Sequence, residues 1–118
     1  MILVVDSGST KTDWIALDDN GNEIFSTQTL GLNPQMLSNE ILNERIKNNF
    51  DIYKNRNSVN KLFFYGAGCG VESTQNRILK VFKSIFENNN FDIKEDTYAA
   101  VFSVVDKGVP SIVNIIGT

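Results

Sequence analysis

Two apolar runs near the start of the chain, separated by a short polar segment, constrain its fold more than any other feature. The runs are residues 2–5 (Ile-Leu-Val-Val) and 14–17 (Trp-Ile-Ala-Leu). An all-apolar run of this kind is typical of a strand that is covered on both faces of a sheet. The polar segment, residues 6–13, leaves room only for a tight connection. The chain therefore predicts neighbouring antiparallel strands over 2–5 and 12–18, with an acid at the exit of the first.

The remaining sequence alternates strand and helix patterns and predicts an α/β fold. Asp18-Asp19-Asn20-Gly21 is a strong hairpin turn that leads into a third strand over 23–29. Further strands are expected over 62–65, 91–93 and 111–116, and helices are expected to begin at Ser38, at Ser73 or Thr74, and at Asp96. The order is β-β-β-α-β-α-β-α with one extra strand. It predicts a mixed five-stranded sheet flanked by helices.

The first two helices are predicted from apolar residues at helical spacing. In the first helix these residues are Leu37, Ile41, Leu42, Ile46, Phe50 and Tyr53. In the second helix they are Ile78, Leu79, Val81, Phe82, Ile85 and Phe86. Each helix is expected to pack this stripe against the sheet.

The predicted elements form one lobe and begin a second. The length of 118 residues suits one domain, and residues 1–110 are expected to be an N-terminal lobe. Residues 111–118 form a buried-type strand that ends in Gly-Thr. Such a strand would leave an apolar edge exposed without a following element. We therefore expect it to be the first strand of a truncated C-terminal lobe, and a homodimer paired through this strand is the alternative.

Composition excludes several classes of function. The net charge of -3 and the pI near 4.8 argue against nucleic acid or an anionic membrane as the main partner. No apolar run approaches the roughly 20 residues of a membrane span. The single Cys69 suits the reducing cytoplasm. Histidine is absent, so acid–base chemistry must come from carboxylates, lysine or tyrosine.

The polar segment after the first strand has the chemistry of a phosphate site. Gly8 would let the backbone approach an oxyanion closely. Asp6 would hold Mg²⁺, and Lys11 could reach a phosphate as a point charge. Further contacts would come from the hydroxyls of Ser9, Thr10 and Thr12. A plain polar hairpin turn is the alternative interpretation, and the cost of burying an acid without a task favours the phosphate site.

The same residues resemble a known family. The pattern Asp6-x-Gly8-x-Thr10-x-Thr12 between two strands resembles the first phosphate motif of the sugar kinase/Hsp70/actin superfamily. Residues 6–13 resemble more closely the N-acetylglucosamine kinase branch, which is grouped with the BadF/BadG/BcrA/BcrD-type ATPases. This resemblance implies a ribonuclease H-like (actin-like ATPase) lobe that uses ATP and Mg²⁺ and phosphorylates an amino sugar. The ATP phosphates would then be bound by Ser7, Gly8, Ser9, Thr10, Lys11 and Thr12.

Three later segments extend the resemblance. Asn33, which precedes Pro34, matches an asparagine that contacts the sugar, although an Asn-Pro turn is the simpler interpretation. Asp96 matches the catalytic aspartate, and an N-cap role at a helix start is compatible with that assignment. Asp92 and Asp106 are weaker candidates. The last two residues, Gly117 and Thr118, match the opening of a second phosphate motif that would border both the sugar and the phosphates.

The glycine-rich segment Gly66-Ala67-Gly68-Cys69-Gly70 is ambiguous in sequence. It could line a cleft, but close packing of a strand against a helix is the favoured interpretation. Related ATPases that activate dehydratases or reductases hold an iron–sulfur cluster with cysteines. One cysteine per chain could ligate a cluster only between two subunits, so Cys69 is expected to be a small buried residue. An ATPase-type activator or a nucleotide or sugar sensor is the alternative function.

Overall fold

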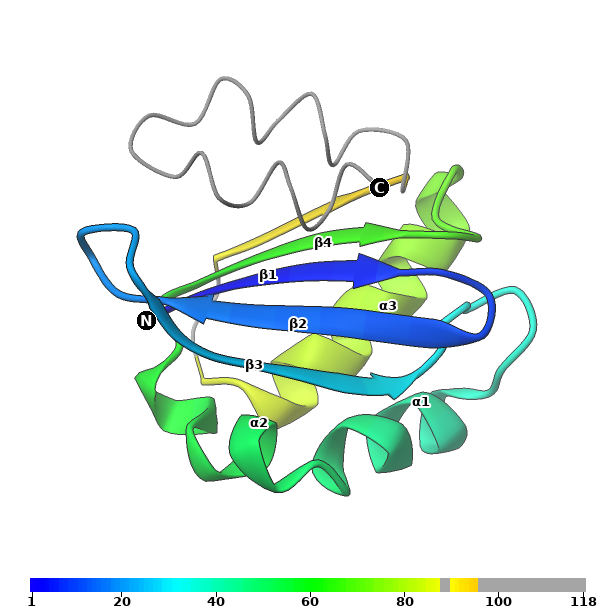
Figure 1. The fold of residues 1–118 in the computed structure, drawn as a ribbon. Helices are drawn as coiled ribbons and strands as arrows, with labels where there is room; N and C mark the ends of the chain where they lie inside the picture. The colour runs from blue at the N-terminus through cyan, green and yellow to red at the C-terminus, as the bar shows by residue number, and fades with distance from the viewer. Residues whose placement is uncertain (88–89, 96–118) are drawn as a thin grey trace.

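A computed structural model describes residues 1–87 and 90–95 of the chain. These residues form a five-stranded sheet with the strand order β3-β2-β1-β4-β5, flanked by helices (Figure 1). The elements are β1 (Ile2–Ser7), β2 (Lys11–Leu17), β3 (Glu23–Leu30), α1 (Asn39–Lys47), α2 (Phe50–Lys54), the short 3₁₀ helix η1 (Arg56–Ser58), β4 (Lys61–Gly66), α3 (Glu72–Ile85) and β5 (Phe91–Lys94). The helix expected from Asp96 and the strand expected over 111–116 lie outside the described residues.

The sheet is mixed, as the sequence predicts. Strands β1, β2 and β3 form an antiparallel meander. Strand β4 pairs with β1 in parallel, and β5 pairs with β4 in parallel. Strand β1 therefore lies at the centre, where an all-apolar run is expected because both faces of a central strand are covered.

Strand β1 is longer than the apolar run predicts. It continues through Asp6 and Ser7, which pair with Asp13 and Thr12 of β2. The same two residues also pair with β4 on the other side. Asp has low strand propensity, but ladder partners on both sides override that preference. The acid thus lies inside the strand, and the connection between β1 and β2 shortens to residues 8–10.

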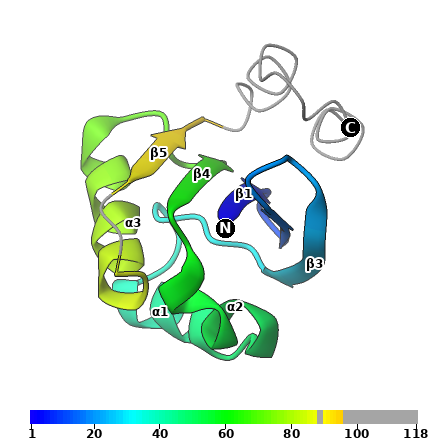
Figure 2. The same cartoon turned by 90° about the vertical axis from the view of Figure 1, so that its left-hand side faces the viewer.

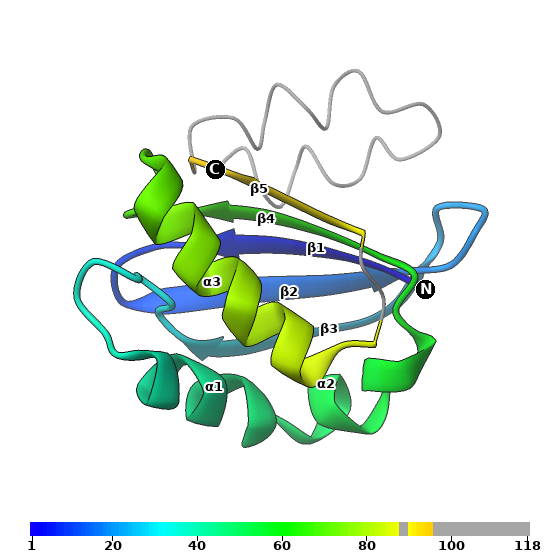
Figure 3. The same cartoon turned by 180° about the vertical axis from the view of Figure 1, so that it is seen from behind.

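The main core lies between the sheet and α3. Figure 3 shows α3 lying across one face of the sheet, and Figure 2 shows all three α-helices on that side. Leu3 and Val5 of β1 point to this face and join the predicted stripe residues Ile78 and Phe82 of α3. On the opposite face, β1, β2 and β4 contribute a smaller buried cluster of Val4, Ile15, Leu17 and Tyr65. Both faces of β1 are therefore apolar and buried.

The first predicted helix is divided in two. Ser38 caps α1 as expected, because its Oγ accepts the N–H of Ile41. Asn49 then begins α2, where its Oδ1 accepts the N–H of Ile52. The break interrupts the predicted stripe, so Phe50 is 73% exposed whereas Leu42 and Ile46 are buried. The stripe prediction was wrong at Ile41, which is 41% exposed, and at Phe50 and Tyr53 beyond the break, where an asparagine cap begins a second helix.

The predicted cap of α3 was also wrong. Helix α3 begins at Glu72, and its N-cap position is Val71, which makes no side-chain cap hydrogen bond. Ser73 and Thr74 lie inside the first turn, where the Thr74 hydroxyl donates to the Val71 carbonyl at 3.0 Å.

Within the described residues, no helix has the length and apolar character that crossing a membrane requires.

Candidate functional site

Several loops meet at one edge of the sheet. Strands β1 and β4 are parallel neighbours, so their carboxyl ends reach the same edge, on the right in Figure 1. Strand β3 also ends there, and residues 31–38 follow it. Ligands of open α/β sheets bind outside the carboxyl ends of the strands, where the connections diverge. The segment singled out in the sequence, residues 6–12, therefore lies at the edge where a ligand site is expected.

The turn of residues 8–10 exposes polar groups at this edge. The Gly8 N–H donates to the Lys11 carbonyl at 2.9 Å and closes the turn. Ser9, Thr10 and Lys11 are exposed. The backbone N–H groups of Ser9 and Thr10 have no hydrogen-bond partner within the described part of the chain. Two donors and two hydroxyls are thus available to an anion.

Gly8 is not required by the fold itself. Its φ is not positive, since Gly21 and Gly68 are the glycines recorded with positive φ. A Cβ added at Gly8 would meet only the Lys11 carbonyl oxygen, at an ordinary 3.6 Å. Neither conformation nor packing against the described residues explains a glycine here. The position leaves a space that a side chain would fill, as a close-fitting ligand requires.

Ser7 and Thr12 lie beneath the turn and are fully buried. The Thr12 hydroxyl donates to the Leu30 carbonyl at 3.1 Å, and the Ser7 hydroxyl lies 2.9 Å from Thr12 Oγ1. Ser7 Oγ in turn accepts the N–H of Leu32 at 3.0 Å. These two hydroxyls therefore bond to each other and to the end of β3, whereas Ser9 and Thr10 face outward.

Asp6 and Asp13 form a pair of facing carboxylates. They are directly opposite in the ladder of β1 and β2, so their side chains share one face, and both are half-buried. Gln28 of β3 donates to Asp13 Oδ1 at 2.7 Å. Like charges directly opposite in a ladder destabilise a sheet.

Carboxylate oxygens are the ligands that Mg²⁺ prefers, and the ion is usually held by one or two carboxylates together with substrate phosphates and water. Asp6 and Asp13 fit this requirement. Among residues 1–87 and 90–95, no group of three or more His, Cys, Asp and Glu side chains could hold a metal ion. Phosphate oxygens and water would therefore have to complete the coordination.

Asn33 is held in place by its own turn and by the glycine-rich loop. Its Oδ1 accepts the N–H of Gln35 at 2.9 Å, which is the Asn-Pro turn expected from sequence. Gly68 lies against the amide so closely that an added Cβ would overlap Asn33 Oδ1. Because Oδ1 already accepts a hydrogen bond, Asn33 can offer Nδ2 as a donor to a ligand. The simple turn and the ligand contact are thus compatible.

Arg77 of α3 fixes the same loop from the other side. Its guanidinium donates to the carbonyl oxygens of Pro34 and Leu37 and to Asn39 Oδ1. A guanidinium has five donors in a rigid fork, so it can hold several acceptors at once. The loop that carries Asn33 is therefore bonded to α3.

The glycines of the Gly66–Gly70 loop are closely packed, but their neighbours are Phe64, Asn33 and Glu95 rather than the helix that the favoured interpretation expected. Gly68 has a φ of +83°, a conformation that favours glycine. An added Cβ at Gly70 would overlap the Glu95 carboxylate, and one at Gly66 would overlap the buried Phe64 ring. Cys69 is fully buried in the main core, as expected. A buried thiol cannot reach a cluster shared with a second subunit, so the iron–sulfur activator loses its one candidate ligand in this chain.

Three predicted site residues, Asp96, Gly117 and Thr118, lie outside the described residues. The described residue that precedes Asp96 is Glu95, which follows β5 and places its carboxylate beside Gly70. Since β5 is parallel to β4, its carboxyl end reaches the same edge as the turn of residues 8–10.

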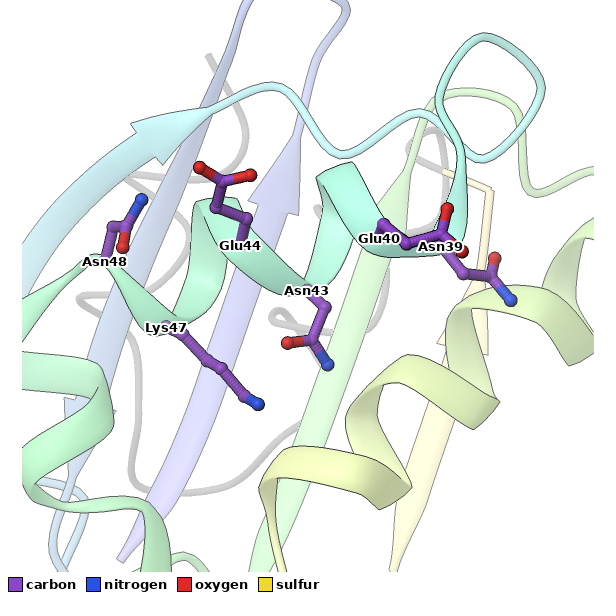
Figure 4. A pocket seen from close by; sticks show the side chains of 6 residues that line it. All are labelled: Asn39, Glu40, Asn43, Glu44, Lys47 and Asn48. Carbon is purple, nitrogen blue, oxygen red and sulfur yellow. The ribbon is translucent and has the colours of Figure 1, made fainter.

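Two open pockets lie on the α1 side of the sheet. The first, of about 480 Å³, is lined by Asn39, Glu40, Asn43, Glu44, Lys47 and Asn48 (Figure 4). All six residues belong to α1 and its C-cap, so the pocket is an open groove along this helix. The second, of about 510 Å³, is lined by Lys11, Gln28, Thr29, Leu30, Arg45, Asn48 and Asn49. It borders the turn through Lys11.

Comparison with solved structures shows that this chain shares its α/β fold with part of another protein. Among solved structures it matches the crystal structure of a "putative N-acetylglucosamine kinase" from Porphyromonas gingivalis, with a TM-score of 0.75 and 24% sequence identity. The match covers 87% of this chain and 38% of the other. No protein-family model and no curated protein sequence matches the chain. At this identity the likeness establishes the fold alone.

Sequence reasoning missed two residues that shape the site. Gly31 lies against the turn, where an added Cβ would be 2.6 Å from the Ser9 carbonyl oxygen. Arg45 of α1 donates to the Gly31 carbonyl at 2.6 Å. Gly31 stands in a segment that reads as a generic loop, and Arg45 reads as an exposed helix residue. No local pattern indicates either contact, because both depend on how β3 and α1 fold back toward β1.

Proposed function

We propose that this chain is the N-terminal lobe of an ATP-dependent sugar kinase, which phosphorylates N-acetylglucosamine or a related amino sugar. The lobe would be of the ribonuclease H-like, actin-like ATPase type, and a C-terminal lobe would supply the adenine site. The observation that carries the proposal is the turn of residues 8–10 at the carboxyl edge of the sheet. It combines two backbone N–H groups that have no partner among residues 1–87 and 90–95 with a glycine that neither its backbone conformation nor its packing against those residues explains.

In this proposal the turn binds the β- and γ-phosphates of ATP. The N–H groups of Ser9 and Thr10, their hydroxyls and the Lys11 ammonium would surround the phosphate oxygens, with Gly8 allowing close approach. Asp6 would hold Mg²⁺ with Asp13 facing it, and the ion would neutralise phosphate charge when bound. Gly117 and Thr118 would approach the phosphates and the sugar from the second motif.

The sugar would bind beside the turn. Asn33 would donate from Nδ2 to an acceptor oxygen of the sugar, because its Oδ1 is bonded to the Gln35 N–H. Asp96 would accept the proton of the attacking sugar hydroxyl. That oxygen would form a bond to the γ-phosphorus as the bond to the β–γ bridging oxygen breaks, and ADP would leave. Such a transfer depends mainly on positioning and charge neutralisation, which the few groups at this edge could provide.

The test is ADP release by the whole protein with and without amino sugar. We expect ADP release that depends on the sugar and is lost in Asp96→Asn, while the variant keeps the unfolding free energy of the unmodified protein. Loss of a general base lowers the rate by about 10²–10⁴-fold. ATP hydrolysis that ignores the sugar and survives in Asp96→Asn would contradict the kinase and favour an ATPase-type activator or sensor. The 118-residue chain alone should show no turnover.

A further inference from the structure

The residues that follow β3 are bonded to the turn of residues 8–10 and to the adjacent end of β1. The Gly31 N–H donates to the Thr10 carbonyl at 2.9 Å, and the Leu32 N–H donates to Ser7 Oγ at 3.0 Å. Gly31 also lies too close to the turn to accept a side chain. The proposed function assigns the two segments to different ligands, the turn to the phosphates and Asn33 to the sugar. The contacts between them therefore lie between the two proposed substrates.

A count of hydrogens shows how Ser7 and Thr12 are used. The Leu30 carbonyl can only accept, so the Thr12 hydroxyl donates its one hydrogen to it. Since the Thr12 hydroxyl has no second hydrogen, Ser7 is the donor in the 2.9 Å contact with Thr12 Oγ1, which is shorter than the 3.5 Å from Ser7 Oγ to the Gly8 carbonyl oxygen. The result is a continuous chain from the Leu32 N–H through Ser7 and Thr12 to the Leu30 carbonyl. While these hydrogen bonds are intact, neither hydroxyl has a hydrogen left to donate to a phosphate.

The environment of this chain of hydrogen bonds makes it rigid. Ser7 and Thr12 are both 0% exposed, and a buried polar group that loses its partner costs about 1–3 kcal/mol. Arg45 holds the same segment from the side of α1 through the Gly31 carbonyl. The segment that leads to Asn33 is thus fixed to both the turn and α1.

We propose that Ser7 and Thr12 are positioning residues that set the distance between the sugar loop and the phosphate turn. This inference rests on the proposed kinase function and replaces a direct phosphate contact for these two hydroxyls. Transfer requires the reacting atoms about 3–3.5 Å apart, and a displacement of about 1 Å can cost roughly 100-fold in rate. Loss of these hydrogen bonds should therefore lower kcat while leaving the binding of each substrate nearly intact.

The test is Thr12→Val in the whole protein, because valine keeps the shape and removes the hydroxyl. We expect kcat to fall by about 10–100-fold, while KM for ATP and for N-acetylglucosamine changes by less than about threefold. Thr12→Ser, which keeps the hydroxyl, should restore kcat. Thr27→Val is the matched control and should leave kcat unchanged, since the Thr27 hydroxyl of β3 accepts from Asn49, the N-cap of α2, at 3.0 Å and, within the described residues, makes no hydrogen bond with the turn.

Ser7→Ala provides an independent variant that breaks the same chain at its other hydroxyl. It should lower kcat by a similar factor. The double variant with Thr12→Val should be no slower than either single variant, because residues of one network are not additive. If Thr12→Val does not fold, kcat and KM are measured in Ser7→Ala and Arg45→Met instead, with the same expected result.

The outcomes separate this inference from the proposed function. A Thr12→Val variant that keeps kcat but raises KM for ATP would show a nucleotide contact and overturn the positioning role, while the kinase stands. Unchanged kcat and KM would also overturn it. If the unmodified protein transfers phosphate to no amino sugar, the proposed function fails first.

Discussion

The two hairpin turns of the β1–β3 meander lie at opposite ends of the sheet and are built in opposite ways. In the turn between β2 and β3, Asp18 Oδ1 accepts the backbone N–H groups of Asn20 and Asn22, each at 2.9 Å. In the turn between β1 and β2, the N–H groups of Ser9 and Thr10 are left without partners among the described residues. The turn between β2 and β3 uses the Asp18 carboxylate to bind its own N–H groups, whereas the turn of residues 8–10 leaves two N–H groups available to a ligand.

The glycines of the two turns differ in the same sense. Gly21 has a φ of 82°, which the turn itself requires of a residue without a side chain. Gly8 has no such φ and no close neighbour at its Cβ position. The comparison teaches that a glycine explained by the fold and a glycine left over for a ligand look alike in sequence. They separate once the backbone and the contacts are known.

The largest change in stability is expected at Gly31, which packs against the open turn, that of residues 8–10. Gly31→Ala should lower the free energy of unfolding by about 2 kcal/mol, because its Cβ would meet the Ser9 carbonyl at 2.6 Å and overpacking typically costs about 1–3 kcal/mol. Urea unfolding of the 118-residue chain measures this. Gly8→Ala is the matched control and should change stability by less than about 1 kcal/mol. Equal stability of the two variants would break the distinction between the glycines.

A smaller loss of stability is expected when acid protonates Asp18 in the turn between β2 and β3. The backbone N–H of Asn22 is the main cause that lowers the pKa of Asp18 below its usual 3.8. A lowered folded-state pKa means that the ionised carboxylate stabilises the fold. This contribution is present above the unfolded value and is lost as the pH falls through the lower folded value.

Amide NMR shifts of the two turns measure this directly. Those of Asn20 and Asn22 should titrate with a midpoint below 3.8, while those of Ser9 and Thr10 should not follow that transition. Asp18→Asn is the control and should remove the titration. A midpoint at or above 3.8, or a parallel titration in both turns, would contradict the difference between them.

Much of the sheet could be predicted from sequence because its strands carry local signals. The apolar run of β1, the Asp18–Gly21 turn and the short apolar run of β4 each specify an element without help from distant residues. The break between α1 and α2 could not be predicted in the same way. It depends on Asn49, which caps α2 and also donates to Thr27 and Gln28 of β3.

The position of the turn of residues 8–10 was predictable from sequence, but the contacts of its side chains were not. The small polar residues after a buried strand located the turn, since such a segment can bring backbone donors to an anion. The division of labour among its hydroxyls follows from the ladder register, which pairs Ser7 with Thr12 and turns both inward. Ser9 and Thr10 face outward from the same short segment. Residue type alone does not distinguish these two pairs.

The most direct test of the account is the affinity of the whole protein for Mg·ATP in Gly8→Ala, measured by calorimetry beside its free energy of unfolding. The account predicts a variant as stable as the unmodified protein, or more stable by about 0.4–1 kcal/mol, whose affinity is at least roughly tenfold weaker, a loss of about 1.4 kcal/mol. An unchanged affinity would contradict the claim that the open turn of residues 8–10 is a phosphate site.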